Sequence, residues 1–184
     1  MQSLHNHIIL MGFKHVGKSV IGKNLSEKLK VPFIDLDHTI EMLYENTYSK
    51  KNTCRQIMQK HGEKFFRYLE MNALSETLDV KPSIISLGGG TPLIVENQKM
   101  IQPCILVHVT APRGIVFERI LMSGMPAFFN PGEDMLKSFN RLWEEREKNY
   151  KEITDILIEN RGSVDDAVRK ITKKLNLDEK INNE

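Results

Sequence analysis

Residues 8–19 read Ile-Ile-Leu-Met-Gly-Phe-Lys-His-Val-Gly-Lys-Ser, an apolar run followed by a loop that begins with a glycine. The run predicts a buried strand, and the loop from Gly12 to Ser19 fits the pattern G-x-x-x-x-G-K-[ST]. Apolar residues beyond the loop are four apart and predict a helix over 18–29, with one face formed by Ile21, Leu25 and Leu29. A strand, this loop and a helix, in that order, are the context that a phosphate-binding loop requires.

The chemistry of the loop supports the same interpretation. A turn that is rich in glycine lets backbone N–H groups point at phosphate oxygens, and the N-terminus of the following helix adds the positive end of its dipole. We expect Lys18 to neutralise the β- and γ-phosphates of a nucleotide and the Ser19 hydroxyl to bind Mg²⁺. A chance match on a turn with an exposed lysine is the alternative, and the strand and helix on either side make it the weaker one.

Short apolar runs alternate with helical segments along the rest of the chain. Further strands are predicted at 33–34, 83–87, 104–109 and 155–158. Thr53 can cap a short helix that Gly62 ends, a second helix is predicted over 63–78, and Ser163 opens the last helix. This alternation predicts a mostly parallel sheet with helices on both faces, whose ligands lie beyond the carboxyl ends of the strands.

Composition predicts one domain over 1–184 with a substantial core, since 40% of the 184 residues are hydrophobic. The net charge of +2 gives no sign of a nucleic-acid or membrane partner. No apolar stretch at the N-terminus is long enough for a signal peptide, so we expect a cytoplasmic protein, and a monomer. Cys54 and Cys104 are expected to be reduced thiols, with a disulfide as the open alternative. The aperiodic, Gly- and Pro-containing stretch at about 123–134 predicts a mobile lid, and the tail at about 177–184 is polar.

Two carboxylates, Asp35 and Asp37, follow the second predicted strand. Side chains two apart on a strand face the same side, so both can reach one site if the strand continues that far. One carboxylate near Mg²⁺ and one near an accepting hydroxyl would suit phosphoryl transfer. Alternatively, Asp37 caps a helix that begins near Thr39, or both carboxylates are solvated.

Two further motifs have the chemistry of an acceptor site. Arg67 and Glu70 are neighbours on a helix, either as a surface ion pair or as an arginine that Glu70 holds for bidentate contact with a substrate carboxylate. Three consecutive glycines, Gly88, Gly89 and Gly90, follow a predicted buried strand. Consecutive glycines cost chain entropy, which favours a close approach of the backbone to a ligand over an elaborate turn.

These motifs, taken in order from about Ile8 to Ile158, resemble the shikimate kinase family. The ordered set comprises the P-loop, the Asp35 and Asp37 pair, the helix from Gly62 to Glu70, the glycine turn and Arg146. The resemblance implies a three-layer P-loop fold like that of nucleoside monophosphate kinases, with a five-stranded parallel sheet. It also implies transfer of the γ-phosphate of ATP to the 3-hydroxyl of shikimate, on the chorismate route to aromatic amino acids.

The resemblance assigns roles to individual residues. Lys18 and Asp37 would be catalytic, and Ser19 and Asp35 would hold Mg²⁺. The nucleotide would be held by Gly12, Lys14, Val16, Gly17, Lys18, Ser19, Val20 and Arg119, the last of which packs on adenine. Shikimate would be held by Asp37, Arg67, Gly88, Gly89, Gly90 and Arg146, with the two arginines on its carboxylate.

The chain departs from the family's pattern at two places. His15 stands where the family usually has a further glycine, and its side chain is expected to point to solvent, with contact to the γ-phosphate as the alternative. Met125 stands where the family typically has an arginine that reaches the transferring phosphates. Either another cation substitutes, or the enzyme is slow, or the substrate differs. Candidate cations are Lys14, Lys137 and Arg141. The alternative role for Met125, Phe128 and Phe129 is to exclude water when the lid closes.

Two other functions remain open from the sequence. One is a kinase for another small polyol acid such as gluconate, which the altered lid permits. The other is a nucleotide-binding regulatory protein that no longer transfers phosphate. Retention of Lys18, Ser19, Asp35 and Asp37 argues against the regulatory protein, because a silent protein has no chemical need for all four.

Overall fold

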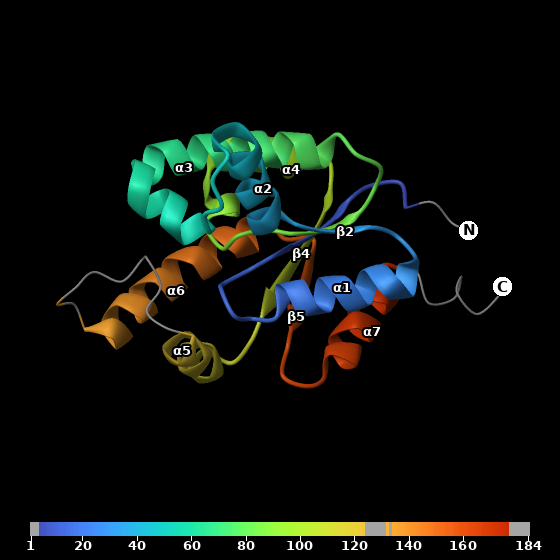
Figure 1. Ribbon diagram of the computed structural model, residues 1–184. Helices are drawn as coiled ribbons and strands as arrows, with labels where there is room; N and C mark the ends of the chain where they lie inside the picture. The colour runs from blue at the N-terminus through green and yellow to red at the C-terminus, as the bar shows by residue number, and fades with distance from the viewer. Residues whose placement is uncertain (1–3, 124–131, 133, 177–184) are drawn as a thin grey trace.

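The fold is built on a five-stranded parallel sheet with the strand order β2-β3-β1-β4-β5. A computed structural model describes residues 4–123, 132 and 134–176 (Figure 1). Its strands are β1 (Ile8–Met11), β2 (Phe33–Asp35), β3 (Ile84–Ser86), β4 (Ile105–Thr110) and β5 (Ile156–Glu159). The predicted five-stranded parallel sheet is therefore confirmed, and the chain visits the strands in an order that needs a crossover helix between parallel neighbours.

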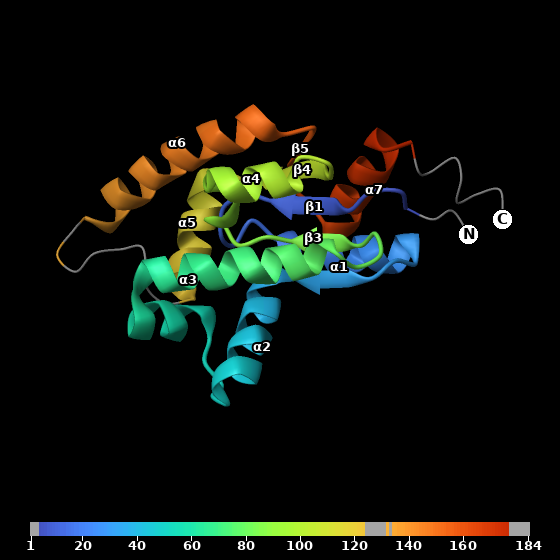
Figure 2. The same ribbon diagram turned by 90° about the horizontal axis from the view of Figure 1, so that it is seen from above.

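Helices cover both faces of this sheet, so the fold has three layers (Figures 1 and 2). One face is covered by α2 (Leu36–Tyr48), α3 (Cys54–Leu78) and α4 (Val95–Ile101). The other is covered by α1 (Lys18–Leu29), α5 (Arg113–Met122) and α7 (Val164–Lys174). The helix α6 (Met135–Ile153) joins the layers, because Phe139 near its start packs in one core cluster and Ile153 at its end packs against the other.

Strand β1 supplies the centre of both cores. Ile8 and Leu10 point into the cluster beneath α1 and α7, whereas Ile9 and Met11 point into the cluster beneath α2 and α3. All four side chains are fully buried. A continuous apolar run, rather than an alternating one, is what a strand covered on both faces requires.

The segment around Asp35 differs from the prediction. Strand β2 ends at Asp35 and helix α2 begins at Leu36, so the idea that a continuing strand aligns Asp35 and Asp37 is wrong. A helix that begins near Thr39 under an Asp37 cap is wrong as well. The Asp35 side chain caps α2 instead, since its Oδ1 accepts from the backbone N–H of Asp37 at 3.2 Å. This cap stabilises the first helical turn and thereby fixes where Asp37 points.

Helix α3 follows the predicted plan. Thr53 and Gln56 form a reciprocal capping box at its start. Gly62 has φ 84° and ψ 169°, which breaks the helix at the predicted residue into a short piece and a long one. The 3₁₀ turn Thr91–Leu93 and helix α4 were not predicted, because both are too short to give a periodic signal.

The predicted lid, the predicted tail and the two cysteines can also be compared with the structure. Most of the predicted lid, at 124–131 and 133, and the tail at 177–184 lie outside the described residues. Cys54 and Cys104 are free thiols, as expected. Within the ranges that the structure describes, every helix is too short or too polar to cross a membrane.

Candidate active site at the carboxyl ends of the strands

A cavity of about 580 Å³ opens beyond the carboxyl ends of β1, β2 and β3. Parallel α/β sheets place their ligand sites at this edge. Residues from six parts of the chain line it: the P-loop with the start of α1, the junction of β2 and α2, the helix α3, the end of β3 with the glycine turn, the residue after α5, and α6. Among them are twelve predicted site residues: Lys14, Gly17, Lys18, Ser19, Val20, Asp35, Asp37, Arg67, Gly88, Gly89, Gly90 and Arg146.

The two glycines of the P-loop occupy positions that a side chain could not fill. Gly12 has φ 142°, and a β-carbon there would lie 2.1 Å from the carbonyl oxygen of Val109. Gly17 has φ 102°, and a β-carbon would lie 2.7 Å from Nδ2 of Asn160. Asn160, just after β5, also donates to the Val16 carbonyl at 2.9 Å. The strands β4 and β5 therefore hold the loop in shape from behind.

Lys18 is buried at the base of the loop. Its ammonium donates to the carbonyl oxygens of Gly12 at 3.0 Å and Phe13 at 2.8 Å. Burial lowers the pKa of Lys18 to about 8, although the nearby carboxylates of Asp37 and Asp35 act in the opposite direction. An amine held this way still carries its proton at neutral pH, and an arriving phosphate would favour that charged form further.

Ser19 and Asp35 form a pair of hard oxygen groups next to Lys18. The Ser19 hydroxyl donates to Asp35 Oδ2 at 2.7 Å, while Oδ1 of the same carboxylate caps α2. Mg²⁺ prefers oxygen ligands of this kind, usually one or two protein groups together with phosphates and water. The residues present therefore fit a magnesium ion.

Asp37 faces the glycine turn from the first turn of α2. A β-carbon on Gly88 would lie 2.9 Å from Asp37 Oδ1, so only a glycine lets the carboxylate approach. Burial and the neighbouring charge of Asp35 raise the pKa of Asp37, while Lys18 lowers it. A carboxylate whose pKa is raised is a better proton acceptor, which suits a group that meets a hydroxyl.

Arg67 is held against the last glycine of the turn. Its guanidinium donates to Glu70 Oε2 at 2.9 Å and, more weakly, to Glu63 Oε1 at 3.4 Å. A β-carbon on Gly90 would lie 2.8 Å from Nη2 of Arg67. Glu70 is 2% exposed and its Oε1 accepts from the Thr91 hydroxyl at 2.7 Å. The Glu70 carboxylate is buried and accepts hydrogen bonds from both Arg67 and Thr91, which is unlike a surface ion pair. These contacts favour the interpretation that Glu70 orients the arginine.

Arg146 reaches the middle glycine from α6. A β-carbon on Gly89 would lie 3.4 Å from Nη1 of Arg146, and the guanidinium stacks over the Phe13 ring at 5.1 Å. The Tyr150 hydroxyl, one turn further along α6, donates to the Gly89 carbonyl. Each glycine of the turn thus faces a different charged side chain, and the absence of β-carbons lets three such groups line one wall.

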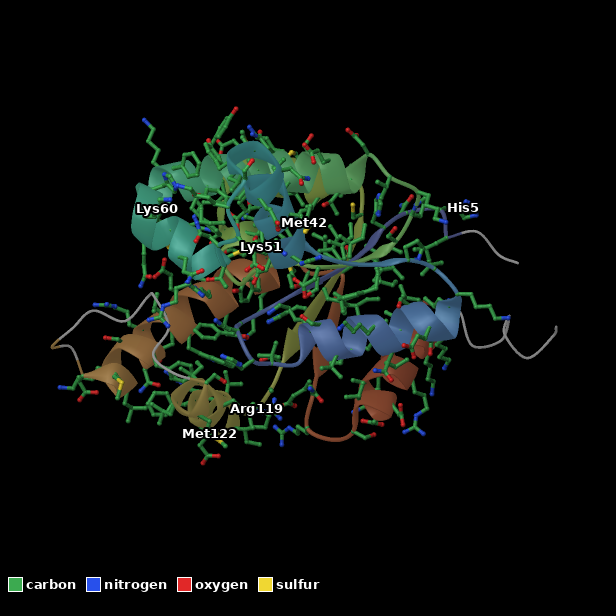
Figure 3. The ribbon with its side chains drawn as sticks, viewed as in Figure 1. His5, Met42, Lys51, Lys60, Arg119 and Met122 are labelled. Atoms are coloured by element: carbon green, nitrogen blue, oxygen red, sulfur yellow. The ribbon has the colours of Figure 1, made fainter. Side chains whose placement is uncertain are left out.

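The remaining predicted residues differ in whether they reach the cavity. Gly12 and Val16 belong to the loop but are buried and do not line the cavity. Arg119 lies on α5 (Figure 3) and its Nη1 donates to the His15 carbonyl at 3.0 Å, so it contacts the back of the loop. Lys14 lines the cavity, whereas Lys137 and Arg141 lie on α6 and do not. Met125, Phe128 and Phe129 lie outside the described residues. His15 lines the cavity and is partly exposed, so the expectation that its side chain points to solvent stays a prediction, with contact to the γ-phosphate as the alternative.

Sequence reasoning missed three lining residues on the first turns of α3: Cys54, Arg55 and Met58. The Cys54 thiol donates to the Asp37 carbonyl at 3.3 Å, and burial raises the pKa of this thiol, so it serves as a neutral wall. Arg55 could have been identified as a candidate site residue from the sequence. It lies in the first turn of a helix with no acidic residue there, where the helix dipole disfavours a cation. Such local conflicts are expected at functional sites.

The fold and the site together define a P-loop kinase like the nucleoside monophosphate kinases, with a phosphate loop facing a second, arginine-lined half of one cavity. A family model described as shikimate kinase matches residues 14–176. The chain belongs to the shikimate kinase family and is an ATP-dependent small-molecule kinase. The predicted family, fold class and shikimate kinase activity are confirmed, and the silent regulatory protein is not supported.

Individual relatives agree with the family model. The shikimate kinase of Bacteroides fragilis is 31% identical over 179 residues, which cover 92% of this chain and 96% of that protein. A bifunctional shikimate kinase/3-dehydroquinate synthase of Thermotoga maritima is 30% identical over 149 residues, covering 81% of this chain but only 28% of the longer relative. The structure of shikimate kinase from Acinetobacter baumannii in complex with shikimate is similar with a TM-score of 0.80, at 27% identity and 92% coverage of both chains.

Proposed function

We propose that the cavity binds MgATP on the P-loop and shikimate on the glycine turn, so that the 3-hydroxyl faces the γ-phosphorus. One observation carries the proposal: Arg67 and Arg146 approach successive glycines of one turn, in the same cavity as Lys18. Two guanidinium groups suit the planar carboxylate of an acid, and an ammonium suits a phosphate. The acid and the triphosphate are thereby placed facing one another.

Asp37 is assigned as the group that receives the acceptor's proton, which its place on the cavity wall beside Gly88 supports. In the proposed step, the shikimate 3-oxygen forms a bond to the γ-phosphorus as its proton passes to the Asp37 carboxylate. The bond between the γ-phosphorus and the β,γ-bridging oxygen breaks, and ADP leaves. Lys18 neutralises charge on the phosphate oxygens throughout the transfer. Positioning and charge neutralisation account for most of the rate enhancement in such reactions.

A magnesium ion is assigned to Ser19 and Asp35 on the fit of their oxygens. When bound, it neutralises and orients the phosphates. The other predictions, namely one domain over 1–184, a monomer, a cytoplasmic location and no nucleic-acid or membrane partner, stay predictions.

The substrate is tested by an assay coupled to ADP release, with MgATP and a panel of acceptors. Shikimate should support turnover, and gluconate should support much less. Gluconate is the second candidate because it also carries a carboxylate for the two arginines. A preference for gluconate over shikimate would overturn the proposed acceptor, while failure of both would point to a different acid.

A further inference from the structure

The P-loop carries a histidine where the backbone favours a glycine. His15 has φ 64°, and within the loop Gly12–Ser19 it is the one residue with a side chain in the left-handed region. A β-carbon is disfavoured there and glycine is not. The Nη1 of Arg119 donates to the His15 carbonyl at 3.0 Å and so holds this backbone from α5. A side chain kept in a disfavoured conformation, at a site of function, points to a use for that side chain.

The imidazole of His15 lies among cations. It is half-buried on the cavity wall, which Lys14 and Lys18 also line. Burial lowers the pKa of His15, and the charges of Lys14, Lys18 and Arg119 lower it further. Lys14 and Lys18 belong to the loop and the start of α1, and Arg119 comes from α5. The imidazole is therefore neutral near pH 7 while the cavity holds no anion.

A bound triphosphate would reverse these electrostatics. Lys14 and Lys18 would then be compensated by phosphate oxygens, and a nearby negative charge favours the protonated form of a histidine. A protonated imidazole can donate a charge-assisted hydrogen bond to a phosphate oxygen, which a neutral acceptor nitrogen cannot. Proton uptake and phosphate binding would consequently reinforce one another.

We propose that His15 is a phosphate-contacting residue of the nucleotide site whose imidazole takes up one proton from solvent when the triphosphate binds. No bond of the nucleotide changes in this step, since the proton moves from the buffer to a ring nitrogen. The inference rests on the proposed nucleotide site and adds a titrating group to it. It makes nucleotide affinity rise as the pH falls, because the protonated form binds the anion more tightly.

The experiment is calorimetric titration of the full chain with MgATP, without acceptor, between pH 6.5 and 8.5. Each titration is run in two buffers of different ionisation enthalpy, so that the dependence of the measured heat on the buffer gives the number of protons taken up. The matched control is His15→Asn, because asparagine tolerates a left-handed backbone and cannot take up a proton in this range. The variant also reports the protonation of the nucleotide itself.

We expect net proton uptake by the wild type at pH 7.5 in excess of the variant, and a Kd that tightens about three- to tenfold more than the variant's from pH 8.5 to 6.5. Equal proton uptake and equal pH dependence in the two proteins would overturn the role of His15 and leave the nucleotide site intact. Failure of the wild type to bind MgATP would instead overturn the proposed function. A His15→Gly variant, whose backbone is relaxed, should match His15→Asn in proton uptake; full wild-type uptake in it would also refute the inference.

Discussion

The Arg67 guanidinium donates a hydrogen bond of 2.9 Å to the Glu70 carboxylate, and the Glu70 side chain is almost fully buried. The same arginine lies 3.4 Å from Glu63, whose side chain is 73% exposed. The two acidic residues lie on either side of Arg67 on α3, but only Glu70 is also tied to Thr91 beside the glycine turn. The buried partner therefore determines where the guanidinium points.

Glu70→Gln should impair acceptor binding with little effect on ATP. The amide keeps the shape but weakens a charge-assisted hydrogen bond, so we expect the KM for shikimate to rise about tenfold and the KM for ATP to stay within about twofold. Steady-state kinetics with each substrate varied in turn measure both. The matched control is Glu63→Gln, which should leave the shikimate KM nearly unchanged because an exposed pair contributes little. Equal effects of the two changes would contradict the assigned role of Glu70.

Gly90→Ala should damage the acceptor site by steric conflict. The added methyl would lie 2.8 Å and 2.9 Å from the Arg67 nitrogens, so the guanidinium must move away from the turn. We expect kcat/KM for shikimate to fall about tenfold or more, since small misplacements of a positioning group are costly. Gly114→Ala is the control, because a β-carbon there meets no atom within 4 Å. Wild-type kinetics in the Gly90→Ala enzyme would show that the turn does not shape the acceptor site.

Arg55→Glu should lower activity through charge. Arg55 is exposed at the cavity wall and its positive charge attracts the anionic substrates. We expect kcat/KM to fall about two- to fivefold at low salt, with the difference from wild type shrinking as salt screens the charge. Lys64→Glu makes the same change of charge on an exposed residue of α3 that does not line the cavity. If kcat/KM falls equally in both variants, the change in net charge explains the loss and Arg55 has no local role.

Leu10→Ala should destabilise the fold. Leu10 is fully buried in β1, at the centre of the cluster beneath α1 and α7. Truncation of such a leucine costs about 2–5 kcal/mol of the free energy of unfolding. Urea denaturation followed by circular dichroism measures the change. Leu157→Ala on β5 is the control, since Leu157 is 44% exposed and should cost less than about 1 kcal/mol. A cost at Leu10 as small as that at Leu157 would be inconsistent with the described core.

Local sequence signals were sufficient for much of this fold. The helix over 18–29 and the capping residue Thr53 were predictable, because periodicity and cap chemistry act within a few residues. The end of β2 was not. Whether Asp35 ends a strand or continues one depends on its side chain capping α2, and the sequence is compatible with both.

The site was predictable in its members but not in its arrangement. The three glycines indicated a close approach, yet only the structure shows that each faces a different partner, Asp37, Arg146 or Arg67. The surroundings of His15 depend on Arg119, which is 104 residues away in the chain. Contacts of that separation leave no periodic trace in a single sequence, so the contact between Arg119 and the His15 backbone could not be predicted from the sequence.

The most direct test of the account compares shikimate with its methyl ester, which lacks the negative charge that Arg67 and Arg146 would bind. The measured quantity is the ratio of kcat/KM for the acid to kcat/KM for the ester, in the wild type and in Arg67→Met. We predict a ratio of about one hundred or more in the wild type, falling about tenfold or more in the variant, because removal of the guanidinium leaves the carboxylate without one of its charged partners. A ratio that is the same in both enzymes would contradict the placement of the acid against the glycine turn.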